Sequence, residues 1–547
     1  MEDSKFDKIV HLEKAGTLKN FISEKEMMSL WSLKITGEIN GADFDEVLDE
    51  MCSATGEYDD DDNFTPDYEY CPKLRILDMG ECTFVGGKTL PYFGYHTLLQ
   101  TLIFPQGIEN LCTEVETGFS ESENLEFVVL PEGLKKIEGF ECCPKLKRIN
   151  IPSSVEEIGT FAFSGDSIEE IFIPKGVNKI TGASFGDCPI KKFVLEEGNP
   201  YLKELDGVIF SYDMKTIMAF PKCFHSRTYV IPSGVEIIGD LSFADSDIDE
   251  VIIPDSVTTI EGWAFQGSHI KRLNIPDSVT TIGELAFRWC EELETVRLPK
   301  YLQAIERQVF SGCSKIKTLD IPGSIKTLHY SSIAWSENLE HIILHDGLEH
   351  IDGDGWLLLG KGNLKELRLP KTLQSLPGGA FHHCTQIKNF EVDPENPFLC
   401  AFEGAIYTKD MKKLIAVPDC SRTEFVVPEG VEELNDYVFA DFTRLKSVTL
   451  PHSLVKIGER VFDSCESLTE VYIHENVKEI HYRAFDNCSS LTAIRVGAKT
   501  PPEVYGDSSH WTFTPKPKNV TLFVPKGTTP LFKEAHLWNK FGKIIEE

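Results

Sequence analysis

The chain has 547 residues, of which 41% are hydrophobic, and its formal net charge at pH 7 is −33. Such a surface repels nucleic acid backbones and anionic lipid, so both are excluded as preferred partners. No segment approaches the ~18 consecutive apolar residues of a membrane span, and the first eight residues lack the apolar core of a secretion signal. We therefore expect no transmembrane span. The chain is either cytoplasmic or has lost a targeting segment.

Residues 1–97 do not follow the pattern of the rest of the chain and are predicted to form an N-terminal cap region. Residues 13–22 have the spacing of an amphipathic helix, and residues 30–35 have that of a strand. The four aspartates at 59–62 lack the order and spacing of an EF-hand calcium loop. We favour an exposed loop for this acidic run, with a calcium site as the alternative.

A block of about 22 residues repeats between residues 98 and 500. Residues 252–260 and 274–282 show it best, because they differ only at the first of nine positions. A proline marks one position of the block at Pro131, Pro152, Pro174, Pro232, Pro254, Pro276, Pro299, Pro322, Pro370, Pro428, Pro451 and Pro525, and a histidine takes that position at His345 and His474. This self-similarity is the signature of a solenoid, whose units bury their apolar faces only against their neighbours.

Each repeat combines a short strand with a turn-forming segment. In residues 293–298, Leu293, Val296 and Leu298 are predicted to point into the core and Arg297 to point out. The marker proline then ends the strand, because it has no N–H to donate. A second apolar stretch and an Ala-Phe pair follow. The short spacing favours a helical turn or 3₁₀ piece for that segment.

Eight of the 15 cysteines share one repeat position, which lies three residues after the phenylalanine of the regular repeats. They are Cys71, a looser match, and Cys143, Cys188, Cys290, Cys313, Cys384, Cys465 and Cys488. Spacing that follows the repeat indicates buried thiols that pack as small apolar groups, with some disulfide pairing as the alternative. No C-x-x-C pair occurs, so zinc and redox motifs have little support.

Two longer blocks interrupt the repeat near residues 196–223 and 393–420. They are related to each other, because Asn199 and Asn396 begin matching segments 197 residues apart. Each is predicted to be a hairpin-like insertion with Asp-Met-Lys at its turn. A structural variant of the repeat is the favoured interpretation, and a functional pair of protrusions is the alternative. Residues 501–547 depart from the repeat again and are predicted to form a C-terminal capping unit.

The order Ile-Pro-x-Ser-Val-x-x-Ile-Gly-x-x-Ala-Phe-x-x-Cys, nearly complete at residues 275–290, resembles the BspA-like leucine-rich repeat family. Residues 10–18 resemble the start of such proteins from gut Bacteroidetes, and residues 522–527 with 538–541 resemble their last unit. The resemblance covers nearly the whole chain. It implies an α/β repeat fold, a right-handed leucine-rich repeat solenoid with short parallel strands, short helical turns and capped ends. It also implies a surface or secreted protein that takes part in adhesion, although the family has no fixed ligand.

No motif of the chain predicts a catalytic, cofactor or metal site. The glycine-rich residues 353–362 lack the spacing of a phosphate-binding loop and fall within the repeat, which favours a distorted turn. His382, His383 and Cys384 are potential metal ligands, but Cys384 is a repeat cysteine and no further ligand lies near in sequence. Choosing a pair of catalytic carboxylates in so acidic a chain would be arbitrary.

The residue two positions before each marker position is predicted to point away from the core, on the open face of the parallel strands. This outward column reads Val129, Asn150, Phe172, Val230, Ile252, Asn274, Arg297, Asp320, Ile343, Arg368, Val426, Thr449 and Tyr472. Its apolar and aromatic members suggest a recognition surface, although β-branched residues also favour strands for their own sake. We select Phe172, Ile252, Arg297, Ile343 and Tyr472 as predicted ligand-binding residues.

The sequence thus predicts a non-enzymatic binding or adhesion protein that presents a concave repeat surface to a protein or glycan. The alternative is a structural scaffold that docks onto other surface proteins of the same cell, and an enzyme is the third hypothesis. The family resemblance implies the cell surface or secretion, with a cytoplasmic location as the alternative.

Overall fold

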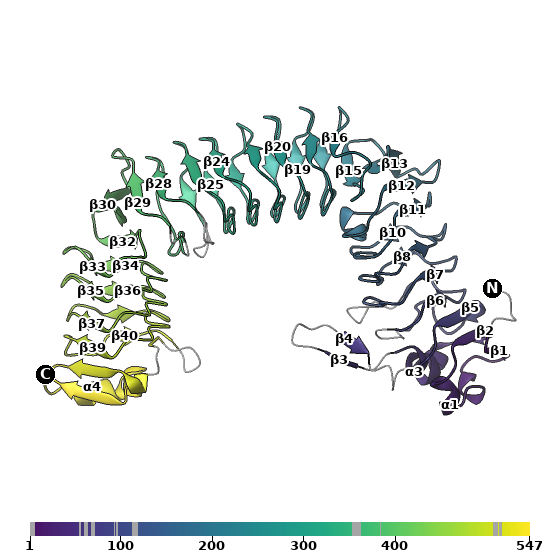
Figure 1. The fold of residues 1–547 in the computed structure, drawn as a ribbon, viewed down its shortest axis with the longest axis horizontal. Coiled ribbons are helices and arrows are strands. Elements are labelled where there is room, and N and C mark those ends of the chain that lie inside the picture. Colours follow the sequence, from purple (N-terminus) through teal and green to yellow (C-terminus); the bar gives the residue numbers. More distant parts are fainter. Residues whose placement is uncertain are drawn as a thin grey trace. The chain divides into compact units, whose positions relative to one another are not determined.

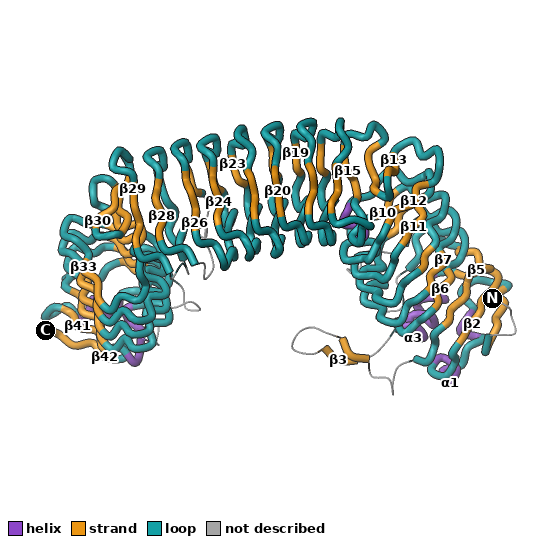
Figure 2. The backbone as a smooth tube through the Cα atoms, turned by 45° about the horizontal axis from the view of Figure 1, so that its top comes forward, coloured by secondary structure: helices purple, strands orange, loops and turns teal. Residues whose placement is uncertain are grey.

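The structure is a computed structural model that describes residues 6–53, 56–58, 64–66, 72–91, 93, 97–111, 119–352, 363–382, 384, 386–506, 512–513 and 517–547. The chain divides into two compact units, unit 1 (Met1–Ile270) and unit 2 (Lys271–Glu547). Both units are built from stacked coils whose short strands lie beside the strands of the next coil (Figures 1 and 2). The repeats that the marker prolines define in the sequence therefore correspond to coils of the structure.

Unit 1 begins with a segment whose parallel strands are longer than those of the later coils. Its parallel strands are β1 (Lys8–Leu12), β2 (Ser32–Ile39) and β5 (Ile76–Phe84), and β3 (Gly56–Tyr58) pairs antiparallel with β4 (Phe64–Pro66). The helical elements are η2 (Leu18–Asn20), α1 (Glu24–Met27), α2 (Gly41–Asp43), η3 (Phe44–Leu48) and α3 (Asp49–Cys52). The strand expected at residues 30–35 is confirmed within β2.

The helix predicted over residues 13–22 is wrong, because only the 3₁₀ turn η2 forms there. Gly16 adopts a left-handed φ of 78°, which ends any helical path. The buried carboxylate of Asp43 then accepts hydrogen bonds from the backbone N–H groups of Gly16 and Leu18, at 2.7 and 2.9 Å. A tertiary hydrogen bond therefore overrides the helical spacing of the sequence.

Two series of short strands run along the coils of unit 1. The outer series, which carries the predicted outward column, comprises β6 (Thr101–Ile103), β7 (Phe127–Val129), β9 (Arg148–Ile149), β11 (Glu170–Ile173), β12 (Lys192–Leu195), β16 (Thr228–Val230) and β18 (Glu250–Ile252). The second series comprises β8 (Lys136–Ile137), β10 (Glu157–Ile158), β17 (Ile237–Ile238) and β19 (Thr259–Ile260). The pairs of neighbouring strands within each series are parallel and in register, as in β16 with β18 and β17 with β19.

Unit 2 has two series of short strands of the same kind. The outer strands are β20 (Arg272–Asn274), β22 (Thr295–Arg297), β24 (Thr318–Ile321), β26 (His341–Leu344), β28 (Glu366–Leu369), β29 (Asn389–Val392), β33 (Glu424–Val426), β35 (Ser447–Thr449), β37 (Glu470–Ile473), β39 (Ala493–Val496), β41 (Thr521–Val524) and β42 (Lys543–Glu546). The second series comprises β21 (Thr281–Ile282), β23 (Ala304–Ile305), β25 (Thr327–Leu328), β27 (His350–Ile351), β34 (Glu433–Leu434), β36 (Lys456–Ile457), β38 (Glu479–Ile480) and β40 (Glu503–Val504). The predicted short parallel strands are therefore confirmed.

The segment after the second strand is mostly turn, so the predicted helical turns are only partly confirmed. Among the described coils, η4 (Gly182–Phe185) is a 3₁₀ helix at this position. Elsewhere residues with left-handed φ interrupt the segment, for example Trp263 at 49° and Leu285 at 57°. A left-handed residue cannot continue a right-handed helix, and these positions turn the chain back toward the next strand.

The phenylalanines of the turn segments form stacks inside the core. In unit 2, the ring centroids of Phe439 and Phe462 lie 5.3 Å apart, and those of Phe462 and Phe485 lie 5.2 Å apart. The repeat cysteines lie beside them. The Sγ atoms of Cys465 and Cys488 donate to the carbonyls of Phe439 and Phe462 in the preceding coil, at 3.2 and 3.1 Å.

The described repeat cysteines are thiols and are not joined in disulfides; all are buried except Cys384, which is half-buried. Cys71 lies outside the described residues. The prediction of a buried thiol ladder is therefore confirmed for the described part of the chain.

Each insertion adds three short antiparallel strands to its unit. These are β13 (Leu202–Leu205), β14 (Val208–Ser211) and β15 (Thr216–Ala219) in unit 1, and β30 (Leu399–Phe402), β31 (Ala405–Thr408) and β32 (Lys413–Ala416) in unit 2. The last strand of each set pairs parallel with the next coil, β15 with β17 and β32 with β34. Met214 and Met411 hold left-handed φ values of 60° and 59° at the matching turns.

The C-terminal segment packs into the core of unit 2. It contains α4 (Thr529–Glu534), η5 (Pro517–Asn519) and η6 (Trp538–Lys540) next to β41 and β42. The Trp538 ring is fully buried, contacts Phe513 at 5.3 Å, and donates its Nε1–H to the Pro502 carbonyl at 2.8 Å. Within the described part of the chain, the helices are too short or too polar to cross a bilayer.

Candidate functional site

The outward column of the sequence is an exposed column of the structure. All of its members are solvent-exposed except Val129, which is half-buried. The exposed fractions of the apolar members are 53% for Phe172, 61% for Val230, 49% for Ile252, 44% for Ile343, 65% for Val426 and 42% for Tyr472. These side chains contribute nothing to the core, because the residues on either side of them in each strand point inward.

Register places equivalent members of the column side by side. In unit 1, Val230 pairs with Ile252 across β16 and β18. In unit 2, Asp320 pairs with Ile343 across β24 and β26, and Val426 pairs with Thr449 across β33 and β35. Neighbouring coils therefore merge their outward side chains into one surface, and Val230 with Ile252 forms an apolar pair.

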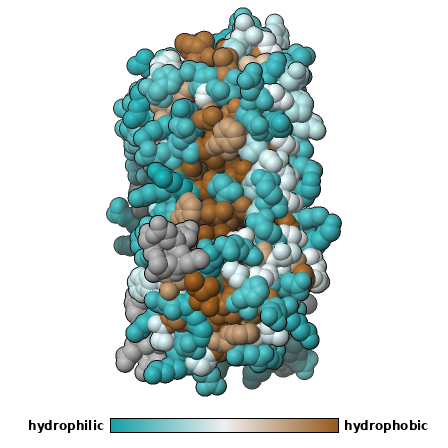
Figure 3. Space-filling view, turned by 90° about the vertical axis from the view of Figure 1, so that its right-hand side faces the viewer, coloured by the Kyte–Doolittle hydropathy of each residue, from teal (hydrophilic) through white to brown (hydrophobic). Residues whose placement is uncertain are grey.

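Figure 3 shows the right-hand side of Figure 1, where the coils of unit 1 lie. Hydrophobic residues form a band in this view, with hydrophilic residues on both sides of it. The exposed strand position two residues earlier is polar in almost every coil, as at Glu170, Thr228 and Glu250, with Phe127 as an exception. The apolar members of the column therefore lie beside a mostly polar exposed position in the same strands.

Arg297 is engaged with the preceding coil. Its Nη1 donates to the carbonyl of Ile275 at 2.6 Å, and its Nη2 donates to Oδ1 of Asp277 at 2.5 Å. The guanidinium also lowers the pKa of Asp277 below its ordinary value. Arg297 is thus exposed, as predicted, but its hydrogen-bonding capacity is already partly used within unit 2.

Aromatic side chains on the turns form a second exposed set that the sequence analysis missed. Phe161 and Trp263 in unit 1, and Trp289 and Trp335 in unit 2, are 40–46% exposed and hold left-handed φ values between 49° and 62°. The Arg288 guanidinium lies 5.5 Å from the Trp289 ring. Comparing the residues just before each Ala-Phe pair would have revealed Phe161 and Trp263.

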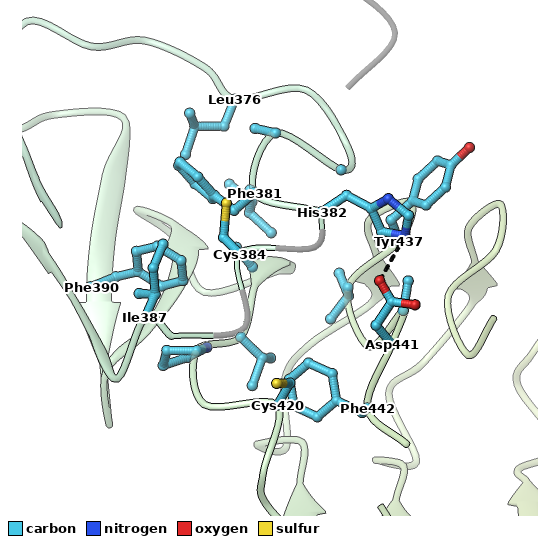
Figure 4. A pocket seen from close by; sticks show the side chains of 18 of the residues that line it. Leu376, Phe381, His382, Cys384, Ile387, Phe390, Cys420, Tyr437, Asp441 and Phe442 are labelled. Atoms are coloured by element: carbon cyan, nitrogen blue, oxygen red, sulfur yellow. Dashed lines mark ion pairs between the residues drawn. The ribbon is translucent and has the colours of Figure 1, made fainter. Parts of the chain in front are cut away.

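A pocket lies where the second insertion interrupts the stack of turn segments (Figure 4). Phe381, His382 and Cys384 come from the coil before the insertion, Cys420 from its end, and Asp441 from the coil after it. Nε2 of the nearly buried His382 lies 3.3 Å from Oδ2 of Asp441. The cavity volume is about 50 Å³, enough for a few water molecules.

The pocket thiols are not activated nucleophiles. Burial raises the pKa of Cys384 to about 12, and burial is also the main reason why the pKa of Cys420 is raised. The reactive form of cysteine is the thiolate, which such a shift suppresses at neutral pH. Both thiols are therefore protonated, and the contact between His382 and Asp441 links the two coils beside the insertion.

Three segments considered in the sequence analysis fall partly or wholly outside the described residues. They are the aspartates at 59–62, the glycine-rich residues 353–362 and His383. Of the predicted metal ligands at 382–384, the structure describes His382 and Cys384. In Figure 4 the Cys384 sulfur lies toward Phe381, whereas the His382 ring points toward Asp441.

A family model described as the BspA-type leucine-rich repeat region matches residues 91–215, 216–340, 264–388, 357–399 and 416–502. The chain belongs to this family. The resemblance in the repeat motif is therefore confirmed, and the stacked parallel strands are those of a BspA-type leucine-rich repeat protein. No curated protein matches the chain.

Several solved structures resemble this BspA-type chain. A leucine-rich repeat protein from Bacteroides ovatus is 23% identical, with 76% of this chain and 88% of that chain covered and a TM-score of 0.40. A leucine-rich cell surface protein from Faecalibacterium prausnitzii is 20% identical, covering 66% and 79%, with a TM-score of 0.36. The pneumococcal vaccine antigen PcpA is 18% identical, covering 64% and 88%, with a TM-score of 0.33.

Proposed function

We propose that this protein is a non-enzymatic binding protein that recognises a protein or glycan through its exposed outer strands. The observation that carries the proposal is the recurrent exposure of apolar side chains at one repeat position, at Phe172, Val230, Ile252, Ile343, Val426 and Tyr472. Leaving such side chains in water is unfavourable unless a partner covers them. The surface is rimmed by polar residues, which is the usual anatomy of an interface.

Strand propensity alone explains the column poorly. β-Branched residues favour any exposed strand position. Yet the other exposed position of the same strands carries Glu170, Thr228 and Glu250 in unit 1, beside the apolar column. An apolar bias confined to one of two equivalent positions supports recognition.

The contacts of the column rank its members as anchors. Ile252 forms an apolar pair with Val230, whereas Arg297 is tied to Asp277 in the preceding coil. Ile343 lies next to Asp320, which also contacts His345 at 2.8 Å. We therefore assign the largest contributions to Ile252 and Ile343, with Phe172 and Tyr472 as flanking anchors and Arg297 as a positioning residue.

The acidic charge limits the class of partner, and the family indicates the location. A net charge of −33 disfavours polyanionic ligands, so a neutral glycan or a neutral or basic protein surface is the expected partner. We place the protein at the cell surface or in the secreted fraction, as its family implies. Protease treatment of intact cells tests the location, because a cytoplasmic protein resists digestion until lysis.

Binding to immobilised host matrix proteins, to glycan arrays and to envelope proteins of the same cell tests the proposal. Ile252→Ser and Ile343→Ser should each weaken binding by about 1 kcal/mol or more. Tyr301→Ser is the matched control, since Tyr301 is 65% exposed but lies outside the column. Selective capture of same-cell envelope proteins would favour the scaffold function. Equal binding by all three variants would contradict a role for the outer strands.

A further inference from the structure

Two histidines and a glutamate meet on adjacent coils of unit 2. His452 follows Pro451 at the end of one outer strand, and His474 follows β37 one coil later, at the position that proline holds elsewhere. Their ring centroids are 3.9 Å apart. One ligand atom from each of His452, His474 and Glu475 lies within 4.8 Å of the other two. Among the described residues this is the one such group of metal-ligating side chains.

His474 is buried, with 8% of its surface exposed, and its Nδ1 atom has no hydrogen-bond partner. A buried polar nitrogen without a partner destabilises the fold and calls for a compensating ligand. An imidazole nitrogen that carries no proton and makes no hydrogen bond is the group that coordinates a metal ion.

The backbone around the cluster is fixed before any ligand arrives. The N–H of His452 donates to Oε1 of Glu429 at 3.2 Å, and its carbonyl accepts a hydrogen bond from Asn476 Nδ2 at 2.8 Å. The Tyr472 ring lies edge-on to the His474 ring with centroids 4.4 Å apart. Glu429 and Glu475 give the site the negative charge that a cation requires.

We propose that His452, His474 and Glu475 bind a divalent transition-metal ion such as Zn²⁺ or Co²⁺. Two imidazoles and one carboxylate suit such borderline ions, whereas Ca²⁺ and Mg²⁺ prefer oxygen ligands only. Metal–ligand bonds of about 2.0–2.1 Å require the donor atoms to lie about 3.4 Å apart. His452 and Glu475 are exposed and His474 is buried, so the proposal requires rotation of the two exposed side chains toward His474.

The site keeps open coordination positions on its solvent side, because the protein supplies three ligands and both His452 and Glu475 are exposed. Water or a side chain from another molecule completes the metal's coordination there. Tyr472, an outward-column residue, lies beside it. The inference stands on the cluster alone and does not depend on the proposed binding function.

The second histidine at a marker position supplies a matched control. His345 has its Nε2 atom 2.8 Å from Oδ1 of Asp320, and it lacks an imidazole neighbour because Gly323 takes the place that His452 holds beside His474. His345→Ala should therefore leave metal binding unchanged. His474→Pro restores the residue of the other repeats, so it removes a ligand with little disturbance of the coil. His452→Ser and Glu475→Gln provide further variants if His474→Pro misfolds.

Titration of the full chain with Co²⁺, followed by absorption and calorimetry, tests the inference. We expect one equivalent to bind without the intense near-ultraviolet charge-transfer band of thiolate ligation, which separates this site from the cysteines. His474→Pro, His452→Ser and Glu475→Gln should each weaken binding at least about tenfold, with Zn²⁺ competing for the same site. The absence of a bound equivalent, a thiolate band only, or equal affinity in these variants and His345→Ala would overturn the proposal.

Discussion

In unit 2, the residue type is constant at the inward position of successive coils and varies at the outward position. The inward position holds Phe439, Phe462 and Phe485, whose rings stack almost parallel, at 1° and 19°. The outward position of the same region holds Val426 and then Thr449 and Tyr472 in the following coils. An inward ring must fit the ring before and the ring after it, whereas an outward side chain meets solvent. The residues that repeat in every coil are therefore those that pack in the core. The residues that vary between coils are those available to contact a ligand.

The largest expected effect comes from breaking a phenylalanine stack. Phe462→Ala removes a fully buried ring that lies between two others, so we expect a loss of about 3–5 kcal/mol in the free energy of unfolding. Val426→Thr, at a 65% exposed position, should change it by less than about 0.5 kcal/mol. Urea unfolding of both variants checks the contrast. Similar effects at the two positions would contradict the distinction between inward and outward sides.

The sequence was sufficient to predict the coils, because each one repeats the same buried contacts. The marker proline locates the strand end, and the cysteine position locates the thiol that donates to a phenylalanine carbonyl in the previous coil. The helical content was harder to predict. Residues with left-handed φ, such as Trp263, interrupt the turn segment. Tryptophan has no intrinsic preference for that conformation, so the sequence does not predict it. The Asp43 hydrogen bonds that disrupt the expected helix over residues 13–22 also come from distant sequence.

The candidate sites were predictable only in part. Exposure of the outward column follows from the alternation of a strand, so Ile252 and Ile343 lie where the sequence placed them. The pairing of Arg297 with Asp277 and the meeting of His452 with His474 both depend on stacking, which brings together residues 20 and 22 positions apart. The exposure of a side chain does not show which molecule binds it, so the partner's identity stays a proposal.

Asp166 provides an intermediate test, because it occupies the cysteine position of its coil in unit 1. One carboxylate oxygen accepts the Cys143 N–H at 2.8 Å, the other has no partner, and burial raises the pKa of Asp166 to about 9. The folded state therefore keeps a proton that the unfolded state releases, and stability falls as the pH rises from about 4 toward 9.

Asp166→Asn keeps the acceptor oxygen but cannot ionise. We expect it to raise the free energy of unfolding by about 1–3 kcal/mol at pH 8 and to leave it nearly unchanged at pH 4. Thermal or urea unfolding at the two pH values measures this difference. The exposed Asp255→Asn is the control and should show no such pH dependence. An equal gain for Asp166→Asn at both pH values would show that its carboxyl group is not protonated in the folded state.

The smallest expected effect per unit of pH is the alkaline sensitivity of one ladder thiol. The Cys188 Sγ atom donates to the Phe163 carbonyl at 2.6 Å, and burial raises the pKa of the thiol from 9.0 to about 12. The folded state thus retains a proton that the unfolded state loses above pH 9, so this contribution to stability is complete below pH 9 and declines between pH 9 and 12. The decline is on the order of 1 kcal/mol per pH unit.

Cys188→Ser should reduce this slope, since a serine hydroxyl does not ionise there and Ser336 already donates to Phe310 in an equivalent place. Lysine and tyrosine titration is common to both proteins and cancels in their difference. Identical slopes in urea unfolding between pH 8 and 11 would mean that Cys188 ionises as readily in the folded coil as in the unfolded chain.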